Sequence, residues 1–188
     1  MSYTTVFLDR DGVINQDSPD YVKNWNEFHF IPGSLDAIAR LTQNGISVIV
    51  ITNQSGINRR IVPLGQLDEI HRRLEQAVRD SGGRVTDIFY CPHRPDEGCD
   101  CRKPKPGLIV AARRRYRIDL SRTIMVGDSD KDVLAGQAAG CGGTILIKTG
   151  NGTRTIQTLE ATGTQPDHVA ADLLQAVKWI VGPHRYRS

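Results

Sequence analysis

Short runs of apolar and β-branched residues alternate along the chain with longer segments in which apolar residues recur at a helical spacing. We expect strands at five of these runs, at residues 4–8, 47–52, 85–90, 123–126 and 144–147. A last edge strand is expected at 166–169. Continuous apolar runs of this length are typical of strands buried on both faces of a parallel sheet.

The segments between these runs predict helices. One begins near Leu35 and ends before Gly45, a residue suited to a helix C-cap, and a second covers 67–78 ahead of Gly82. Further helices are expected at 108–116, 131–139 and 171–181. The alternation predicts an α/β fold with a three-layer, Rossmann-like parallel sheet flanked by helices. The helix, strand and loop expected within 11–52, and those within 53–103, leave no room for an inserted domain.

Length and charge limit the function classes. A chain of 188 residues can bury one full core, so a single domain over 1–188 is expected. The 24 basic and 21 acidic residues are spread evenly and give a net charge of +3, which does not favour a nucleic-acid partner. The longest apolar run, 48–51, is too short to span a membrane, and no leader is apparent. A cytoplasmic monomer is therefore expected, with a disordered basic tail at 184–188.

Two carboxylates, Asp9 and Asp11, directly follow the first predicted strand. The carboxyl end of a strand is where open α/β sheets carry out chemistry. One ionised carboxylate there can attack a substrate while the other supplies a proton to the leaving group. An Asp-x-Asp pair by itself is more often an exposed turn or a helix cap, so its meaning depends on the other strand ends.

Three further polar segments lie after the second, third and fourth predicted strands. Residues 52–55 (Thr-Asn-Gln-Ser) offer hydroxyl and amide groups to phosphoryl oxygens, although they are also common turn formers. Arg102 and Lys103 can neutralise charge shared by a carboxylate and a phosphate, although most lysines are merely solvated. Asp128 and Asp132 lie in an acidic loop where Mg²⁺ could bridge a nucleophile and a transferring group.

A second cluster lies between residues 52–55 and Arg102. Three thiols and an imidazole fall within eleven residues, at Cys91, His93, Cys99 and Cys101. Four such ligands complete a tetrahedral zinc shell, so the zinc would be structural, and it would fix the loop that carries Arg102 and Lys103. The alternative is buried thiols beside a surface histidine. Cys141 is left over and is interpreted as a small buried side chain.

These segments, in this order, resemble the haloacid dehalogenase-like phosphatase superfamily over residues 4–150. The resemblance implies a capless enzyme in which Asp9 forms an aspartyl-phosphate and Asp11 protonates the leaving oxygen and then activates water. Asp11 would need a pKa raised by neighbouring carboxylates, while Asp9 stays ionised. Mg²⁺ would be held by Asp9, the main-chain carbonyl of Asp11 and Asp128, with Asp132 behind them. Thr52 and Lys103 would stabilise the phosphoryl group.

Within that superfamily, a zinc loop leading directly into Cys-Arg-Lys-Pro resembles two groups, the heptose 1,7-bisphosphate 7-phosphatases of lipopolysaccharide and surface-glycan synthesis and the histidinol-phosphate phosphatases. Residues 9–15 and 52–59 are more similar to the heptose group, whereas the short zinc loop and Arg60 depart from it. The resemblance implies a phosphosugar substrate. Candidate contacts are Asp17 and Tyr21 for the sugar, Asn53, Gln54 and Ser55 for the phosphoryl group, and Arg59 or Arg102 for a distal phosphate.

Three alternatives stay open at this point. The chain could be a histidinol-phosphate phosphatase, a phosphatase of nucleic-acid ends, or a zinc-stapled binding module with a catalytically dead phosphatase fold. The small basic excess disfavours the second. The presence of both carboxylates with Thr52, Lys103 and Asp128 disfavours the third, because a binding module has no need of two catalytic acids.

Overall fold

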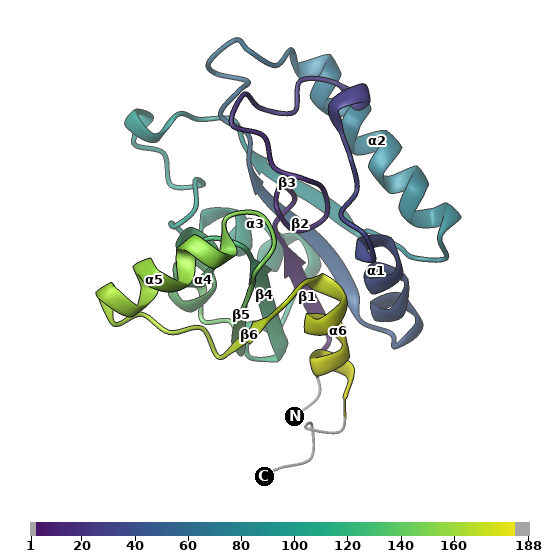
Figure 1. Ribbon diagram of the computed structural model, residues 1–188, viewed down its shortest axis with the longest axis vertical. Coiled ribbons are helices and arrows are strands. Elements are labelled where there is room, and N and C mark those ends of the chain that lie inside the picture. The colour runs from purple at the N-terminus through teal and green to yellow at the C-terminus, as the bar shows by residue number, and fades with distance from the viewer. Residues whose placement is uncertain (1–2, 183–188) are drawn as a thin grey trace.

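A computed structural model describes residues 3–182 as six parallel strands between helices (Figure 1). The strands are β1 (Thr5–Leu8), β2 (Ser47–Asn53), β3 (Asp87–Cys91), β4 (Thr123–Gly127), β5 (Gly143–Ile147) and β6 (His168–Ala170). The helices are α1 (Ser34–Gln43), α2 (Leu64–Asp80), α3 (Gly107–Tyr116), α4 (Asp130–Ala139), α5 (Gly152–Thr162) and α6 (Leu173–Val181). Short 3-10 turns occupy Trp25–Glu27, Pro95–Glu97 and Leu120–Arg122. The predicted three-layer α/β architecture is confirmed.

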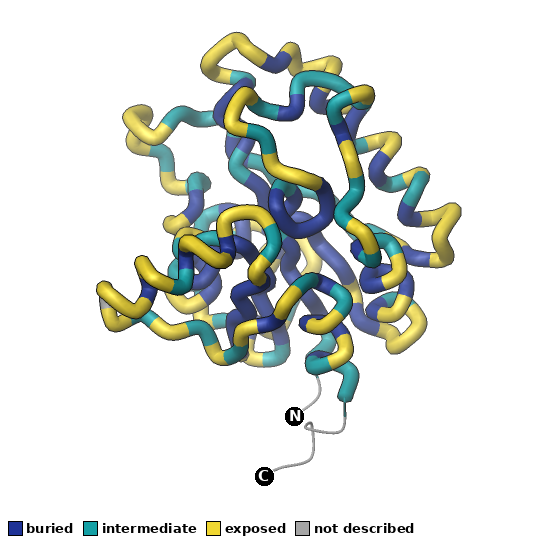
Figure 2. The backbone as a smooth tube through the Cα atoms, in the orientation of Figure 1, coloured by how far each residue is buried: buried dark blue, intermediate teal, exposed yellow. Residues whose placement is uncertain are grey.

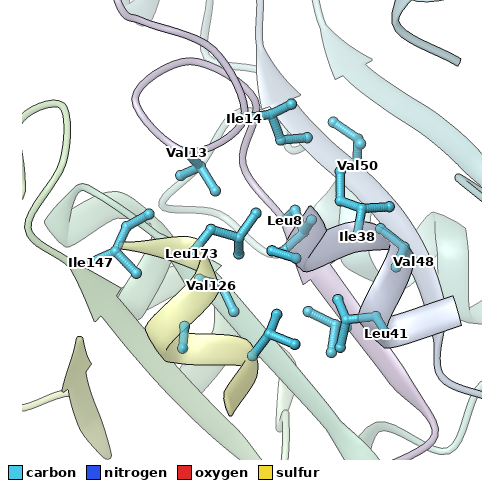
Figure 3. Packing of buried hydrophobic residues seen from close by; sticks show 14 of the residues in the cluster. Leu8, Val13, Ile14, Ile38, Leu41, Val48, Val50, Val126, Ile147 and Leu173 are labelled. Atoms are coloured by element: carbon cyan, nitrogen blue, oxygen red, sulfur yellow. The ribbon is translucent and has the colours of Figure 1, made fainter. Parts of the chain in front are cut away.

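The central strand β1 is buried on both faces, which explains its continuous apolar sequence. Val6 and Leu8 pack with residues of α1, α2 and α6, whereas Phe7 packs on the other side with residues of α3 and α4. Figure 3 shows part of the first cluster, with Leu8 and Val126 from the sheet close to Leu173 of α6. Successive strand residues point to opposite faces, so these three residues bind the sheet to both helical layers.

Each predicted strand and helix is present, with shifts of one to three residues at most ends. Helix α5 was not predicted, because the sequence interpretation assigned no element between residues 148 and 165. In that helix, Leu159 packs with Val133 and Leu146 in a small separate cluster, and Ile156 packs against this cluster. Two apolar anchors give too weak a periodic signal to predict a helix. The tail predicted as disordered lies outside the described residues.

The strand order β3-β2-β1-β4-β5-β6 places β1 between β2 and β4. The chain runs outward from β1 to β3, then crosses back to β4 on the other side of β1. This reversal creates a crevice at the carboxyl ends of β1 and β4, the position at which such sheets bind ligands. Because Leu8 pairs with Val126, Asp9 and the residues after β4 emerge next to each other.

Between β1 and β2 the chain forms only a loop, a 3-10 turn and α1, and between β2 and β3 only α2 and its connections. No separate domain is therefore inserted over the crevice in residues 3–182, which agrees with the predicted capless fold. Figure 2 shows the turn at 12–15 buried at the centre of the molecule, while the outward sides of α2 and α5 are exposed. Among the same residues, no helix has the length and apolar character needed to cross a membrane.

Candidate active site

Lys103 and three aspartates form a buried charge cluster at the carboxyl edge of the sheet. The Lys103 ammonium lies 2.9 Å from Asp9 and 2.6 Å from Asp132, and it donates to the carbonyl of Ile51 at 2.7 Å. Lys103 is 2% exposed. A buried ammonium is stable only when it is paired, and these three acceptors satisfy its three donors. The structure therefore brings together Asp9 and Lys103, which are 94 residues apart in the sequence.

The protein's own charges do not favour an ionised Asp9. Burial raises the pKa of Asp9 well above its usual value, and the carboxylates of Asp132 and Asp128 raise it further, against the opposing effect of Lys103. Burial and Asp132 also raise the pKa of Asp128, to about 7. A divalent cation at these oxygens would favour the charged form of both carboxylates.

The carboxylates fit such a cation. One oxygen from each of Asp9, Asp128 and Asp132 lies within 4.8 Å of the others, and oxygen ligands are those that Mg²⁺ prefers. Asp132 already accepts from Ser129 through one oxygen and from Lys103 through the other. Both oxygens of Asp132 therefore already have protein partners, and its position behind the ligands stays a prediction.

Gly12 allows Asp128 to approach the turn after β1. It has a φ of +80°, and a Cβ atom at this position would lie 2.2 Å from a carboxylate oxygen of Asp128. Any larger residue would therefore push Asp128 away from Asp9, in addition to straining the backbone. The glycine after the acid pair is thus required by the geometry of the carboxylate cluster.

The carboxylate of Asp11 accepts five hydrogen bonds, three of them from Arg10. The guanidinium binds both carboxylate oxygens through Nη2 at 2.8 and 2.9 Å, and Nε adds a contact at 3.2 Å. Asn15 and Gln54 donate to the same carboxylate at 2.9 and 2.7 Å. Every donor hydrogen bond of this kind stabilises the ionised form.

The expected direction of the Asp11 pKa is consequently wrong. Burial alone would raise the pKa of Asp11, but the Arg10 charge and the hydrogen bonds from Asn15, Arg10 and Gln54 outweigh burial and lower it. The sequence interpretation considered the neighbouring carboxylates and overlooked the arginine between the two acids. Ionised Asp11 is suited to accepting a proton, and a phosphate dianion beside it would raise its pKa towards the acid form.

The residues at the end of β2 contact two parts of the site, the carboxylate of Asp11 and the loop that carries Lys103. Thr52 and Gln54 are buried and joined by a 2.9 Å hydrogen bond, and Gln54 also holds Asp11. Asn53 was expected to contact a phosphoryl group. It lines the cleft, and its side chain pairs in both directions with the main chain of Lys103, at 3.1 Å each, which fixes the lysine loop against β2.

A polar cleft of about 310 Å³ opens over the carboxylates. Of the predicted sugar contacts, Asp17 and Tyr21 line it together with Ser55, which lies 3.4 Å from the Tyr21 hydroxyl. Arg102 also lines the cleft, and its guanidinium donates to the carbonyl of His93 at 3.1 Å. Arg59 is not among the lining residues, because it lies one helical turn beyond Ser55 on the exposed surface.

The lining also includes polar residues that were not predicted as site residues, Lys131 and Asn151 among them. Lys131 is the second residue of α4, and Asn151 lies in the loop after β5. Asn151 donates to Asp128 through its main-chain N–H at 2.7 Å and to Asp17 through its side chain at 3.0 Å. Asn151 thus belongs to the site, although it lies just beyond residues 4–150, over which the chain resembles the superfamily. Its place after a predicted strand of the same sheet was the available signal.

The four predicted zinc ligands converge where β3 ends. Their ligand atoms lie within 4.8 Å of one another, with sulfur–sulfur distances of 3.1–3.6 Å and two sulfur–nitrogen distances of 3.3 and 3.5 Å. A tetrahedral zinc with bonds of about 2.3 Å to sulfur requires ligands about 3.8 Å apart. The Cys91, His93, Cys99 and Cys101 side chains thus fit a zinc ion after a slight expansion.

Comparisons with known proteins agree with this geometry. The HAD-hydrolase-like family model matches residues 100–176. A D-glycero-beta-D-manno-heptose-1,7-bisphosphate 7-phosphatase of Pseudomonas aeruginosa is 51% identical over 83% of this chain and 87% of its own.

The D,D-heptose 1,7-bisphosphate phosphatase of Bordetella bronchiseptica, crystallised with magnesium and phosphate, has 44% identity and a TM-score of 0.88 over 95% of this chain and 98% of its own. The corresponding Burkholderia thailandensis structure has 35% identity and a TM-score of 0.71 over 95% and 99%. The chain belongs to the heptose-1,7-bisphosphate 7-phosphatase family of haloacid dehalogenase-like hydrolases.

Proposed function

We propose that this protein hydrolyses the 7-phosphate of D-glycero-D-manno-heptose 1,7-bisphosphate, in the synthesis of nucleotide-activated heptose for lipopolysaccharide or surface glycans. The observation that carries the proposal is the meeting of Asp9, Lys103 and Asp128 beneath a polar cleft, in a chain 51% identical to an enzyme of that name. It acts as a single capless domain, and its phosphosugar substrate enters through the open cleft.

In the first step, a carboxylate oxygen of Asp9 attacks phosphorus and the bond from phosphorus to the sugar oxygen breaks. Asp11, protonated in the complex with the dianionic substrate, gives its proton to that leaving oxygen. Thr52 and Lys103 lie beside Asp9 and stabilise the negative charge that spreads over the transferring group. The product of this step is an aspartyl-phosphate and the free sugar hydroxyl.

In the second step, Asp11 accepts a proton from water, whose oxygen attacks phosphorus and breaks the bond to Asp9. Phosphate leaves, Asp11 releases the proton to solvent because its pKa is lowered in the free protein, and it takes up a proton again when the next dianionic substrate binds. Asp9, the carbonyl of Asp11 and Asp128 would hold the magnesium ion. When bound, Mg²⁺ supplies positive charge that neutralises the nucleophile and the transferring oxygens. The donors on Asp11 favour the ionised form that this step requires.

The predicted zinc site lies directly before Arg102 and Lys103, the two cations that line the cleft next to it. We assign a structural zinc to the Cys91, His93, Cys99 and Cys101 side chains, which provide four ligands and leave no coordination position for water. The same loop continues into Arg102, which is bonded to the main chain of His93, and into Lys103. Zinc binding therefore orders the segment that carries both cations.

Arg102 is the better candidate for gripping the second phosphate of the substrate. Its guanidinium lines the cleft, whereas Arg59 lies outside it. Arg102→Ala is expected to raise the KM for the bisphosphate about tenfold or more with a smaller effect on kcat, since a charged hydrogen bond contributes roughly 1.5–3 kcal/mol. Arg59→Ala is the matched control and should keep both constants. Steady-state phosphate release tests both variants, and a larger KM effect from Arg59 would reverse the assignment.

The substrate is tested by measuring phosphate release from the heptose bisphosphate beside release from histidinol phosphate. The first ester should give a kcat/KM at least about a hundredfold larger, because Arg102 and Lys131 have a second anionic group to bind only in the bisphosphate. A preference for histidinol phosphate would show that the chain has the other activity predicted from its zinc loop. Absence of magnesium-dependent release from either ester would favour a binding module.

A further inference from the structure

Arg10 lies between the two acids of the motif, and its side chain is 1% exposed. Removing a guanidinium from water costs several kcal/mol unless its donors find acceptors. Its side chain satisfies this requirement at Asp11, where three N–H···O contacts of 2.8–3.2 Å fix the carboxylate in one plane. The orientation of Asp11 therefore depends on the orientation of the Arg10 guanidinium.

Two groups hold the remaining side of the guanidinium. Nη1 lies 3.4 Å from Nε2 of His71 on α2, and the guanidinium carbon lies 5.9 Å from the centre of the Phe28 ring. Phe28 offers an apolar surface, but a ring contact at that distance has little directionality. His71 is the contact that can select one rotation of the guanidinium.

The chemistry of the pair fixes the state of His71. Arginine only donates hydrogen bonds, so Nε2 of His71 must carry a free electron pair to accept one. The surroundings agree, because burial and the positive charge of Arg10 lower the pKa of His71 to about 3. The imidazole is thus neutral at physiological pH. Its ring also lies 5.7 Å from the ring of Tyr90 on β3, which restricts its position from the other side.

We infer that His71 is a positioning residue for the phosphatase reaction: it orients Arg10, and Arg10 orients the carboxylate of Asp11 that moves the proton. The inference rests on the proposed function. It assigns a role to α2. Among the described hydrogen bonds and ion pairs, the contact between His71 and Arg10 is the one that links this helix to Asp11. A purely structural histidine would affect stability but not the proton-transfer steps.

The test uses three variants of the full-length protein. His71→Phe keeps an aromatic ring and removes the acceptor, whereas His71→Gln provides a carbonyl oxygen that can accept from Arg10. Ile70→Val, on the preceding position of α2, removes one buried methylene from the core and serves as the stability control. Each variant is measured with heptose bisphosphate, whose leaving alkoxide needs a proton, and with p-nitrophenyl phosphate, whose leaving phenolate does not.

We expect His71→Phe to lower the single-turnover rate of sugar release about tenfold with little change in KM, since general acid catalysis contributes roughly 10²–10⁴-fold and Asp11 would be displaced rather than lost. The initial burst of p-nitrophenolate should stay within about twofold of wild type, followed by a slower steady rate, because hydrolysis of the aspartyl-phosphate still needs Asp11 as base. His71→Gln should recover most of the rate. Ile70→Val should leave both rates unchanged.

Equal losses with both esters in the first step would overturn the inference, as would wild-type kinetics in His71→Phe. A loss in His71→Gln as large as that in His71→Phe would also overturn it, since the two differ in the acceptor. These outcomes are distinct from failure of the proposed function, in which the wild-type protein itself releases no phosphate from heptose bisphosphate and both proposals fall together.

Discussion

Asp9→Asn is expected to abolish turnover, with a loss of at least roughly 10³-fold in kcat, while the protein remains folded. The amide has the shape of the carboxylate but is not nucleophilic, so no aspartyl-phosphate can form. A loss of 10³ corresponds to about 4 kcal/mol of transition-state stabilisation. Lys103 keeps Asp132 and the Ile51 carbonyl as partners in the variant, so the buried ammonium is not left unpaired.

A loss of turnover in Asp9→Asn must be distinguished from a loss of folded protein. Asp68→Asn, on the exposed side of α2, is a matched control for the loss of one negative charge and should keep wild-type turnover. The variant Asp9→Asn should unfold at a temperature close to that of wild type, because removing one of three crowded carboxylates offsets the loss of its ion pair with Lys103. Turnover near the wild-type rate in folded Asp9→Asn would exclude Asp9 as the nucleophile.

Cys99→Ser is expected to lose the zinc ion and to lower the melting temperature by roughly 10 °C. A hydroxyl is a poor zinc ligand, and the energy of metal binding is also folding energy for the loop that it organises. A loss of about 3 kcal/mol shifts the melting temperature by that amount in a chain of this size. Activity should fall as well, since the loop positions Arg102 and Lys103.

Cys141→Ser provides the control, because Cys141 lies outside the four-ligand cluster and packs beside the core near α3 and α4. It should retain one zinc ion for each chain. The measurements are metal content by mass spectrometry and thermal unfolding followed by circular dichroism. Zinc at the wild-type level in Cys99→Ser would show that the ligands are assigned wrongly, whatever the melting temperature.

The fold could be predicted well because its signals are local. Continuous apolar runs such as Val48–Ile51 predicted buried parallel strands, and the regular apolar spacing of α2 predicted a helix with one buried face. Helix α5 was missed because its contacts with the sheet involve few apolar residues, chiefly Leu159. Its position is decided by tertiary packing, which periodicity does not record.

The candidate site could be predicted in part. The order of polar segments at strand ends located Asp9, Lys103 and Asp128, because parallel strands bring their carboxyl ends to one edge. The state of Asp11 could not be predicted, since it depends on which way Arg10 turns and on the donors of Asn15 and Gln54, which reach the same carboxylate. Spacing shows which residues can meet; it does not show which donors reach a given carboxylate.

The central claim is covalent capture of phosphorus by Asp9, and trapping the intermediate tests it most directly. Rapid acid quenching during turnover of heptose bisphosphate, followed by borohydride reduction, converts an acyl-phosphorylated aspartate into homoserine. Peptide mass spectrometry should find homoserine at position 9 in the wild-type protein and no modification in Asp9→Asn. Homoserine at another aspartate, or phosphate release by folded Asp9→Asn at the wild-type rate, would contradict the account.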